Sequence, residues 1–151
     1  MFYLKSSGIE IYNPGECAKT LYFLAAERLE PVIPPNCCVV MVYPYDWTEM
    51  MTPWAHSGRG MEKTGGGAEF AEAFEADLIS QVEPRLGRGV MRRGIAGYSL
   101  GGLEALYMAT RMKCFAFAGS VSGSLWYKGA AEYFLDNPLD ENIYNVYMSL
   151  G

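Results

Sequence analysis

The stretch GIAGYSLGGLEAL, residues 94–106, decides how this chain is interpreted. It contains the pattern Gly-x-Ser-x-Gly at Gly97, Ser99 and Gly101. A bare match to this pattern is common, but here an apolar strand-like segment leads in and a helix-like segment leads out. Small residues at these positions and at Gly102 allow a tight turn in which the serine backbone is strained. Such a turn presents the serine hydroxyl at the C-terminal edge of a sheet, so we predict that Ser99 is a nucleophile.

The rest of the chain alternates between strand-like and helix-like segments. Strands are expected at 8–14, 20–26, 37–44, 90–97, 114–123 and 142–151, and helices at 68–87, 102–113 and 129–136. In the longest helix Phe70, Phe74, Leu78 and Val82 recur every four residues and form one apolar stripe. This alternation predicts an α/β fold, with a mainly parallel sheet flanked by helices in a single, partial domain over 1–151.

Composition excludes several classes of protein. Half of the 151 residues are hydrophobic and the net charge is −5, which argues against a nucleic-acid groove or a basic membrane-binding face. No apolar run approaches the roughly 20 residues needed to span a bilayer, and no signal peptide is expected. The four cysteines lack a C-x-x-C pair, so we expect thiols in a reducing, cytoplasmic compartment. No metal or organic cofactor is expected.

Two segments of the sequence carry a resemblance to a known family. GIAGYSLGGLEALYMA followed by FAFAGSVSGSLWY resembles the nucleophile elbow and next strand of the α/β-hydrolase superfamily. More narrowly, the chain resembles the esterase D-like family, which includes enterochelin- and siderophore-esterase-like enzymes. The loop with YDWTEMMTPW and TGGGAEF is similar to the siderophore-esterase branch. The resemblance covers about residues 9 to 151 and implies an α/β-hydrolase fold that hydrolyses a small-molecule carboxylic ester.

The resemblance also implies roles for particular residues. Ser99 would attack the acyl carbon, a histidine would take its proton, and an acid would orient that histidine. The backbone N–H of Leu100 would be one oxyanion donor. The second donor would lie near Ala26 and Glu27, where the chain reads LAAERL and the family often has His-Gly. This departure leaves the second donor open.

The base and the acid are harder to place. In this superfamily the acid and then the histidine follow the serine along the chain, so both are expected beyond residue 151, in a fold truncated before its last strand and helix. The only histidine present is His56. It lies in the long loop 43–67, which is expected to follow a strand next to the elbow strand, and could act as base, line the pocket or face solvent. Asp136, Asp140 and Glu141 are interpreted as helix-end and loop charges.

Aromatic and polar residues around the loop are the candidates for a substrate pocket. They are Tyr45, Asp46, Trp47, Trp54, His56 and Tyr98. Trp54 could equally shape the pocket or pack the loop onto the domain. The triple glycine at 65–67 is interpreted as a flexible start to the following helix.

The final strand would leave an uncovered sheet edge, which predicts a homo-oligomer. Two alternatives to an esterase remain, a non-catalytic hydrolase-fold fragment or binding protein and, with less support, an acyltransferase that uses the same serine. The substrate stays open.

Overall fold

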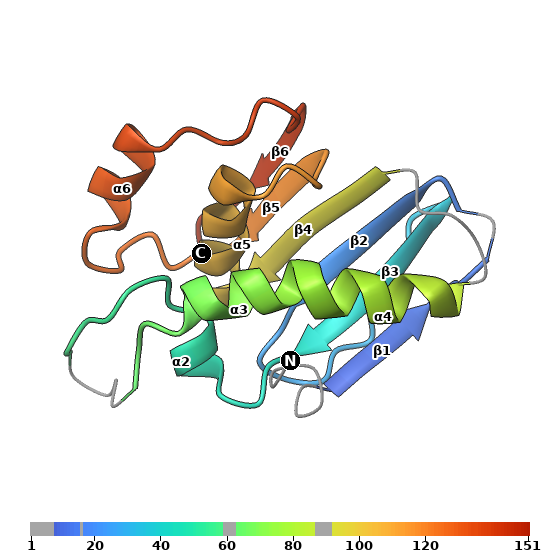
Figure 1. Cartoon of the computed structure of the whole chain (residues 1–151), viewed down its shortest axis with the longest axis horizontal. Coiled ribbons are helices and arrows are strands. Elements are labelled where there is room, and N and C mark those ends of the chain that lie inside the picture. The colour runs from blue at the N-terminus through green and yellow to red at the C-terminus, as the bar shows by residue number, and fades with distance from the viewer. Residues whose placement is uncertain (1–7, 16, 59–62, 87–91) are drawn as a thin grey trace.

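A six-stranded sheet forms the centre of the molecule (Figure 1). The structure is a computed structural model of the chain, and it describes residues 8–15, 17–58, 63–86 and 92–151. The strands are β1 (Gly8–Tyr12), β2 (Lys19–Leu24), β3 (Cys37–Tyr43), β4 (Arg92–Tyr98), β5 (Phe117–Val121) and β6 (Asn145–Met148). Their order across the sheet is β1-β3-β2-β4-β5-β6. Only the β1–β3 pairing is antiparallel in this part of the chain, which confirms the predicted α/β fold with a mainly parallel sheet.

All six predicted strands are present, most of them shorter at their ends than predicted. The apolar run CCVVMVY of β3 is buried along six of its seven residues, as expected for an interior strand covered on both faces. The expected extension of β4 to residues 90 and 91 falls outside the described residues. β6 keeps only four residues of the predicted 142–151, because its pairing with β5 ends at Met148.

Helical segments connect these strands. They are α2 (Trp47–Met50), α3 (Gly67–Ala73), the π-helical η1 (Phe74–Ile79), α4 (Ser80–Val82), the 3₁₀-helical η2 (Glu83–Leu86), α5 (Leu100–Arg111) and α6 (Ala130–Asp136). The predicted helix at 68–87 is the run α3–η1–α4–η2, and its four-residue apolar stripe is buried as predicted. The π-helical turn in its middle was not predicted, because the four-residue spacing of apolar side chains is the same in an ordinary helix.

The described helices pack on one face of the sheet. In Figure 1 α3, α4 and α5 lie in front of the strands. Tyr22 of β2 packs edge-to-face on Phe74, with ring centroids 5.2 Å apart, and joins the main core between sheet and helices. On the opposite face a smaller core forms around Val39 and Met41, against the partly buried Leu21 and Phe23. α5 runs along the middle strands and is buried from Leu100 to Ala109.

Candidate functional site

The strand-to-helix turn at Ser99 has the strained backbone that the sequence predicts. Ser99 adopts φ 57° and ψ −118°, between the end of β4 and the start of α5. A non-glycine residue with positive φ carries a backbone cost of order 1–3 kcal/mol. That cost is tolerated only where the surroundings fix the conformation, and the turn is held on both sides. The Ser99 N–H donates to the carbonyl of Val121 at 3.0 Å, and the N–H of Gly102 donates to the Ser99 carbonyl at 3.0 Å.

The glycines of the turn are required by close packing. A Cβ at position 97 would stand 2.3 Å from the backbone of Gly101. At position 101 it would meet the carbonyl oxygen of Leu24 at 2.8 Å and the ring of Trp47 at 2.7 Å. At position 102 it would meet Ser120 Oγ at 2.7 Å. The small residues therefore allow helix α5, strand β2 and strand β5 to converge beneath the serine.

The start of α5 offers backbone N–H groups beside Ser99. The first N–H groups of a helix have no acceptor within it. Here the carbonyl of Ser99 accepts from Gly102 and Leu103, whereas the N–H of Leu100 and that of Gly101 have no acceptor in the described part of the chain. Together with the positive end of the helix dipole, they make a local environment suited to an anionic oxygen.

The segment after β2 reaches the same edge of the sheet. β2 pairs directly with β4, with Leu24 opposite Gly97, so Ala26 and Glu27 follow at the C-terminal end of the neighbouring strand. The preceding N–H, of Ala25, donates to the Val42 carbonyl at 3.0 Å. Ala26 and Glu27 are both exposed. They share this edge of the sheet with Ser99, and their role as the second donor stays a prediction.

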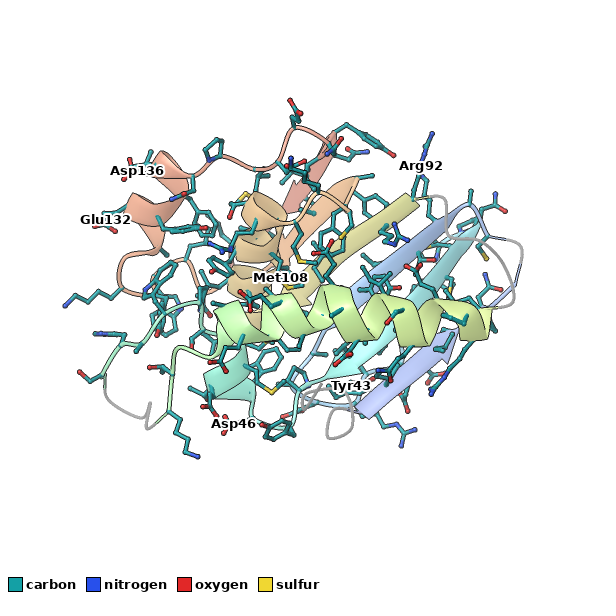
Figure 2. All side chains as sticks on the ribbon, viewed as in Figure 1. Tyr43, Asp46, Arg92, Met108, Glu132 and Asp136 are labelled. Atoms are coloured by element: carbon teal, nitrogen blue, oxygen red, sulfur yellow. The ribbon has the colours of Figure 1, made fainter. Side chains whose placement is uncertain are left out.

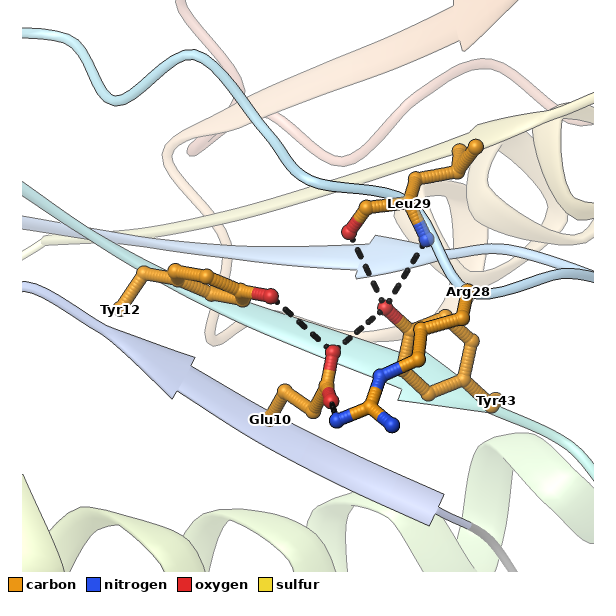
Figure 3. A network of polar contacts seen from close by, with 5 residues as sticks. All are labelled: Glu10, Tyr12, Arg28, Leu29 and Tyr43. Atoms are coloured by element: carbon orange, nitrogen blue, oxygen red, sulfur yellow. Dashed lines mark hydrogen bonds and ion pairs between the residues drawn. The ribbon is translucent and has the colours of Figure 1, made fainter.

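A polar network at the edge of the sheet anchors this segment (Figure 3). Glu10 of β1 accepts hydrogen bonds from Tyr12 and Tyr43, both at 3.0 Å, and pairs with Arg28. The Tyr43 hydroxyl also lies 3.4 Å from both the N–H and the carbonyl oxygen of Leu29. Because Arg28 and Leu29 immediately follow Glu27, the network ties the chain beyond the candidate donors to β1 and β3.

We expected the loop after β3 to follow a strand that neighbours the elbow strand β4. The structure shows that it does not. β3 pairs with β1 and β2, and β2 separates it from β4. The loop nevertheless returns to the serine turn through α2, where the Trp47 ring lies against Gly101. Asp46 caps α2 by accepting from the Glu49 N–H at 3.1 Å, and Figure 2 shows it beside this short helix. Asp46 therefore has a structural role in this site.

Trp54 packs the loop onto the body of the protein. Its ring contacts those of Tyr107, Tyr127 and Tyr133, and its indole N–H donates to the Lys128 carbonyl at 2.8 Å. The Tyr127 hydroxyl donates back to the Trp54 carbonyl at 2.7 Å. The sequence left two roles open for Trp54, and these contacts favour packing of the loop onto the domain over shaping a substrate pocket.

The remaining candidates lie around this cluster and around the turn. The His56 imidazole stands edge-on to the Tyr127 ring, with centroids 5.8 Å apart, and within the described residues it makes no hydrogen bond to Ser99. Tyr98 and Tyr45 are exposed, and Tyr98 is the last residue of β4. Asp136 closes α6, on the outer side of the molecule in Figure 2.

Ser124 is a site residue that sequence reasoning missed. Its Oγ lies 3.1 Å from Ser99 Oγ, and its N–H donates to the Ser99 carbonyl at 3.0 Å. Ser124 belongs to the segment SGSLWY, residues 122–127, directly after β5, and its side chain is buried. The motif was visible in the sequence, but only the folded chain brings this serine beside Ser99.

The triple glycine at 65–67 begins a helix, as predicted, since Gly66 is the N-cap of α3 and Gly67 is its first residue, and the turn before the helix is closely packed. Gly65 has φ +97°, and a Cβ there would stand 2.6 Å from the Ala55 nitrogen. Gly67 lies against Glu104, whose carboxyl group is fully buried within α5. Burial raises the pKa of Glu104 well above its ordinary value. A glutamate inside the core has no periodic signal by which the sequence could have revealed it.

No three His, Cys, Asp or Glu side chains in the described ranges are grouped to hold a metal ion. None of the described helices combines the length and apolarity needed to cross a membrane.

Solved structures with the same architecture define the class of the fold. The siderophore hydrolase EstB from Aspergillus nidulans aligns with a TM-score of 0.68 at 18% identity, covering 100% of this chain and 71% of EstB. The BES protein from Bacillus cereus aligns with a TM-score of 0.67 at 17% identity, covering 96% of this chain and 83% of BES. With the strained serine turn, this places the chain among proteins of the α/β-hydrolase fold.

The sequence comparison then gives the family. A family model described as "Putative esterase" matches residues 7–142, and the chain belongs to this esterase family. The protein YbbA of Bacillus subtilis (strain 168), described as uncharacterized, is 29% identical over 123 residues. That match covers 78% of this chain and 49% of YbbA, so the chain spans about half the length of this curated relative.

Proposed function

We propose that this chain carries the nucleophile of a serine hydrolase that cleaves a small-molecule carboxylic ester. The observation that carries the proposal is the serine held at φ 57° at the start of α5, with two backbone N–H groups free of acceptors beside it. Membership of an esterase family and the fold shared with a siderophore hydrolase support the same reaction class.

In the proposed mechanism the Ser99 hydroxyl attacks the acyl carbon and passes its proton to a general base. Negative charge develops on the carbonyl oxygen, and the N–H of Leu100 stabilises it together with a donor from Ala26 or Glu27. The protonated base gives its proton to the leaving alcohol. Water, activated by the same base, then hydrolyses the acyl-serine. The strained turn lowers the reorganisation needed, because the hydroxyl and the helix N-terminus are already fixed relative to each other.

We propose that the base of this mechanism is a histidine outside the 151 residues. His56 is the only histidine of the chain, and its ring packs on Tyr127 without a hydrogen bond to Ser99. We propose the same for the acid, since Asp136 and Asp140 lie on α6 and its following loop.

We further propose a cytoplasmic location, on the cysteine pattern and charge of the sequence.

A fluorophosphonate probe tests the nucleophile directly. In a protein that includes the proposed base and acid, we expect labelling of the parent, loss of labelling in Ser99→Ala, and unchanged labelling in Ser57→Ala, an exposed loop serine that serves as the control. Equal labelling of the parent and Ser99→Ala would rule out Ser99 as the reactive group.

A non-catalytic binding protein is the second candidate, and the position of His56 away from Ser99 favours it. It predicts no labelling of the parent together with binding of an ester ligand. An acyltransferase would label as the esterase does, and product analysis with a competing acceptor alcohol separates the two.

A further inference from the structure

The hydroxyl of Ser99 has a defined partner at this site. Its Oγ lies 3.1 Å from Ser124 Oγ, and no other side chain among the described residues hydrogen-bonds to it. Ser124 is 1% exposed, whereas Ser99 is half-buried and faces the edge of the sheet. A buried hydroxyl beside a reactive one is shielded from water, so this contact is not exchanged for solvent.

Several backbone bonds hold Ser124 in this position. Its N–H donates to the Ser99 carbonyl at 3.0 Å, and its own carbonyl accepts from Tyr127 at 3.0 Å. Tyr127 is in turn fixed by its hydroxyl bond to the Trp54 carbonyl. The segment that carries Ser124 is therefore attached to the serine turn on one side and to the Trp54 cluster on the other.

The chain tolerates local strain to bring Ser124 there. Ser122 directly follows β5, the strand that pairs with β4, and has φ 47°. Like Ser99, it is therefore a serine with positive φ at the end of a strand. A Cβ at position 123 would stand 1.9 Å from Ser120 Oγ, so only glycine fits between Ser122 and Ser124. Strained backbone of this kind persists where surrounding structure over-determines it, and it concentrates at functional sites.

We propose that Ser124 is a positioning residue for Ser99, an inference that rests on the proposed function. Either hydroxyl can donate while both are protonated. When Ser99 passes its proton to the base, Ser124 becomes the donor and its O–H stabilises the developing charge on Ser99 Oγ. Ser124 keeps its own proton throughout, so it aligns the nucleophile and favours its deprotonated form without entering the proton transfer.

The first test measures alignment independently of activity. In serine-labelled protein, the Hα–Hβ couplings of Ser99 report whether its side chain occupies one rotamer. We expect one rotamer in the parent, averaging in Ser124→Ala, and one rotamer in Ser124→Thr, which keeps the hydroxyl. Ser120→Ala is the matched control, because this buried hydroxyl has no partner among the described residues. A single Ser99 rotamer in folded Ser124→Ala would overturn the proposal.

The second test measures the reactivity of Ser99 against pH with the fluorophosphonate probe, in a protein that includes the proposed base and acid. We expect Ser124→Ala to be labelled about tenfold more slowly, with the inflection moved to higher pH, and Ser124→Thr to recover most of the rate. A purely structural role would leave the inflection in place. If the parent is not labelled while the rotamer test succeeds, the proposed function fails and the positioning contact stands. An unchanged rate and inflection in Ser124→Ala would remove any effect of Ser124 on reactivity.

Discussion

The carboxyl group of Glu104 lies directly against the backbone of Gly67. A Cβ at position 67 would stand 2.2 Å from Glu104 Oε2 and 2.8 Å from the carbonyl oxygen of Thr52. Glu104 lies on α5 and Gly67 begins α3, so this contact sets how closely the start of one helix approaches the side of the other. Both Glu104 oxygens are buried without a hydrogen-bond partner in the part of the chain that the structure describes.

Replacing Gly67 with alanine adds a methyl group where there is no space. We expect Gly67→Ala to lower the free energy of unfolding by about 1–3 kcal/mol, the usual effect of overpacking a core. Urea unfolding measures this change. The matched control is Gly58→Ala in the same loop, where the new Cβ meets only the His56 ring at 3.5 Å and a change within about 0.5 kcal/mol is expected. Equal losses in the two variants would contradict the close approach at Gly67.

Glu104 should make the stability of the protein fall as the pH rises. Burial raises the pKa of its carboxyl group in the folded chain above the ordinary value. Between the unfolded and the folded pKa, the folded chain holds a proton that the unfolded chain has lost. The free energy of unfolding therefore decreases by about 1.4 kcal/mol per pH unit between the two pKa values. Below and above this window, Glu104 adds no pH dependence.

The substitution Glu104→Gln removes the titration, so its stability relative to the parent should increase from pH 5 upwards. Urea unfolding at a series of pH values gives the difference. The control is Glu132→Gln, an exposed residue of α6 that Figure 2 shows at the outer surface. The difference in free energy of unfolding between the parent and Glu104→Gln should therefore change with pH. If it does not, the Glu104 carboxyl group is solvated or paired.

The sequence predicted those parts of the fold that depend on local pattern. The buried run of β3 and the stripe from Phe70 to Val82 follow from apolar periodicity, which is set by which face of each element meets the core. The beginning of α5 was predicted at Gly102, two residues late, because the preceding Gly101 is a poor helix former. The place of these two glycines in the helix is decided by contacts with Leu24 and Ser120, which lie far away in sequence.

Other features depend on tertiary arrangement and carry no local signal. The position of β2 between β3 and β4 follows from how the whole sheet assembles. Ser99 was predictable because its turn has a sequence signature, whereas Ser124 reaches it only through the turn after β5. Glu104 was hidden for the opposite reason, since a glutamate in a helix usually indicates a solvent-facing position.

The ion pair between Glu83 and Arg93 should stabilise the end of the sheet opposite the serine. Arg93 makes two bonds to Glu83, at 2.5 and 2.9 Å, and the Tyr22 hydroxyl donates to the same carboxylate at 2.9 Å. Burial, followed by the charge of Glu83, raises the pKa of Tyr22, so the phenol remains a donor. The side chains of Arg93 and Glu83 are only 26% and 14% exposed, which limits solvent screening.

We expect Arg93→Gln to lower the free energy of unfolding by about 1–3 kcal/mol, because it leaves a half-buried carboxylate without its counter-charge. Thermal or urea unfolding measures the loss. The neighbouring Arg92→Gln serves as the control. Arg92 is exposed and stands 5.8 Å from the Tyr144 ring, so a loss below about 1 kcal/mol is expected there. If the two variants lose the same stability, the Glu83 pairing contributes nothing specific.

In the 151-residue chain by itself, the edge strand β6 should bring two copies together. It pairs with β5 on one side and with no described strand on the other, and all four of its residues are exposed. Large exposed apolar side chains gather along and beside it, namely Tyr144, Val146, Tyr147, Met148 and Leu150.

An unpaired apolar edge favours pairing with a second copy, so we expect light scattering to give a dimer mass. Val146→Lys should shift the mass to that of a monomer, whereas Val32→Lys, at an exposed loop position, should not. A monomer at all concentrations in the parent would contradict this prediction.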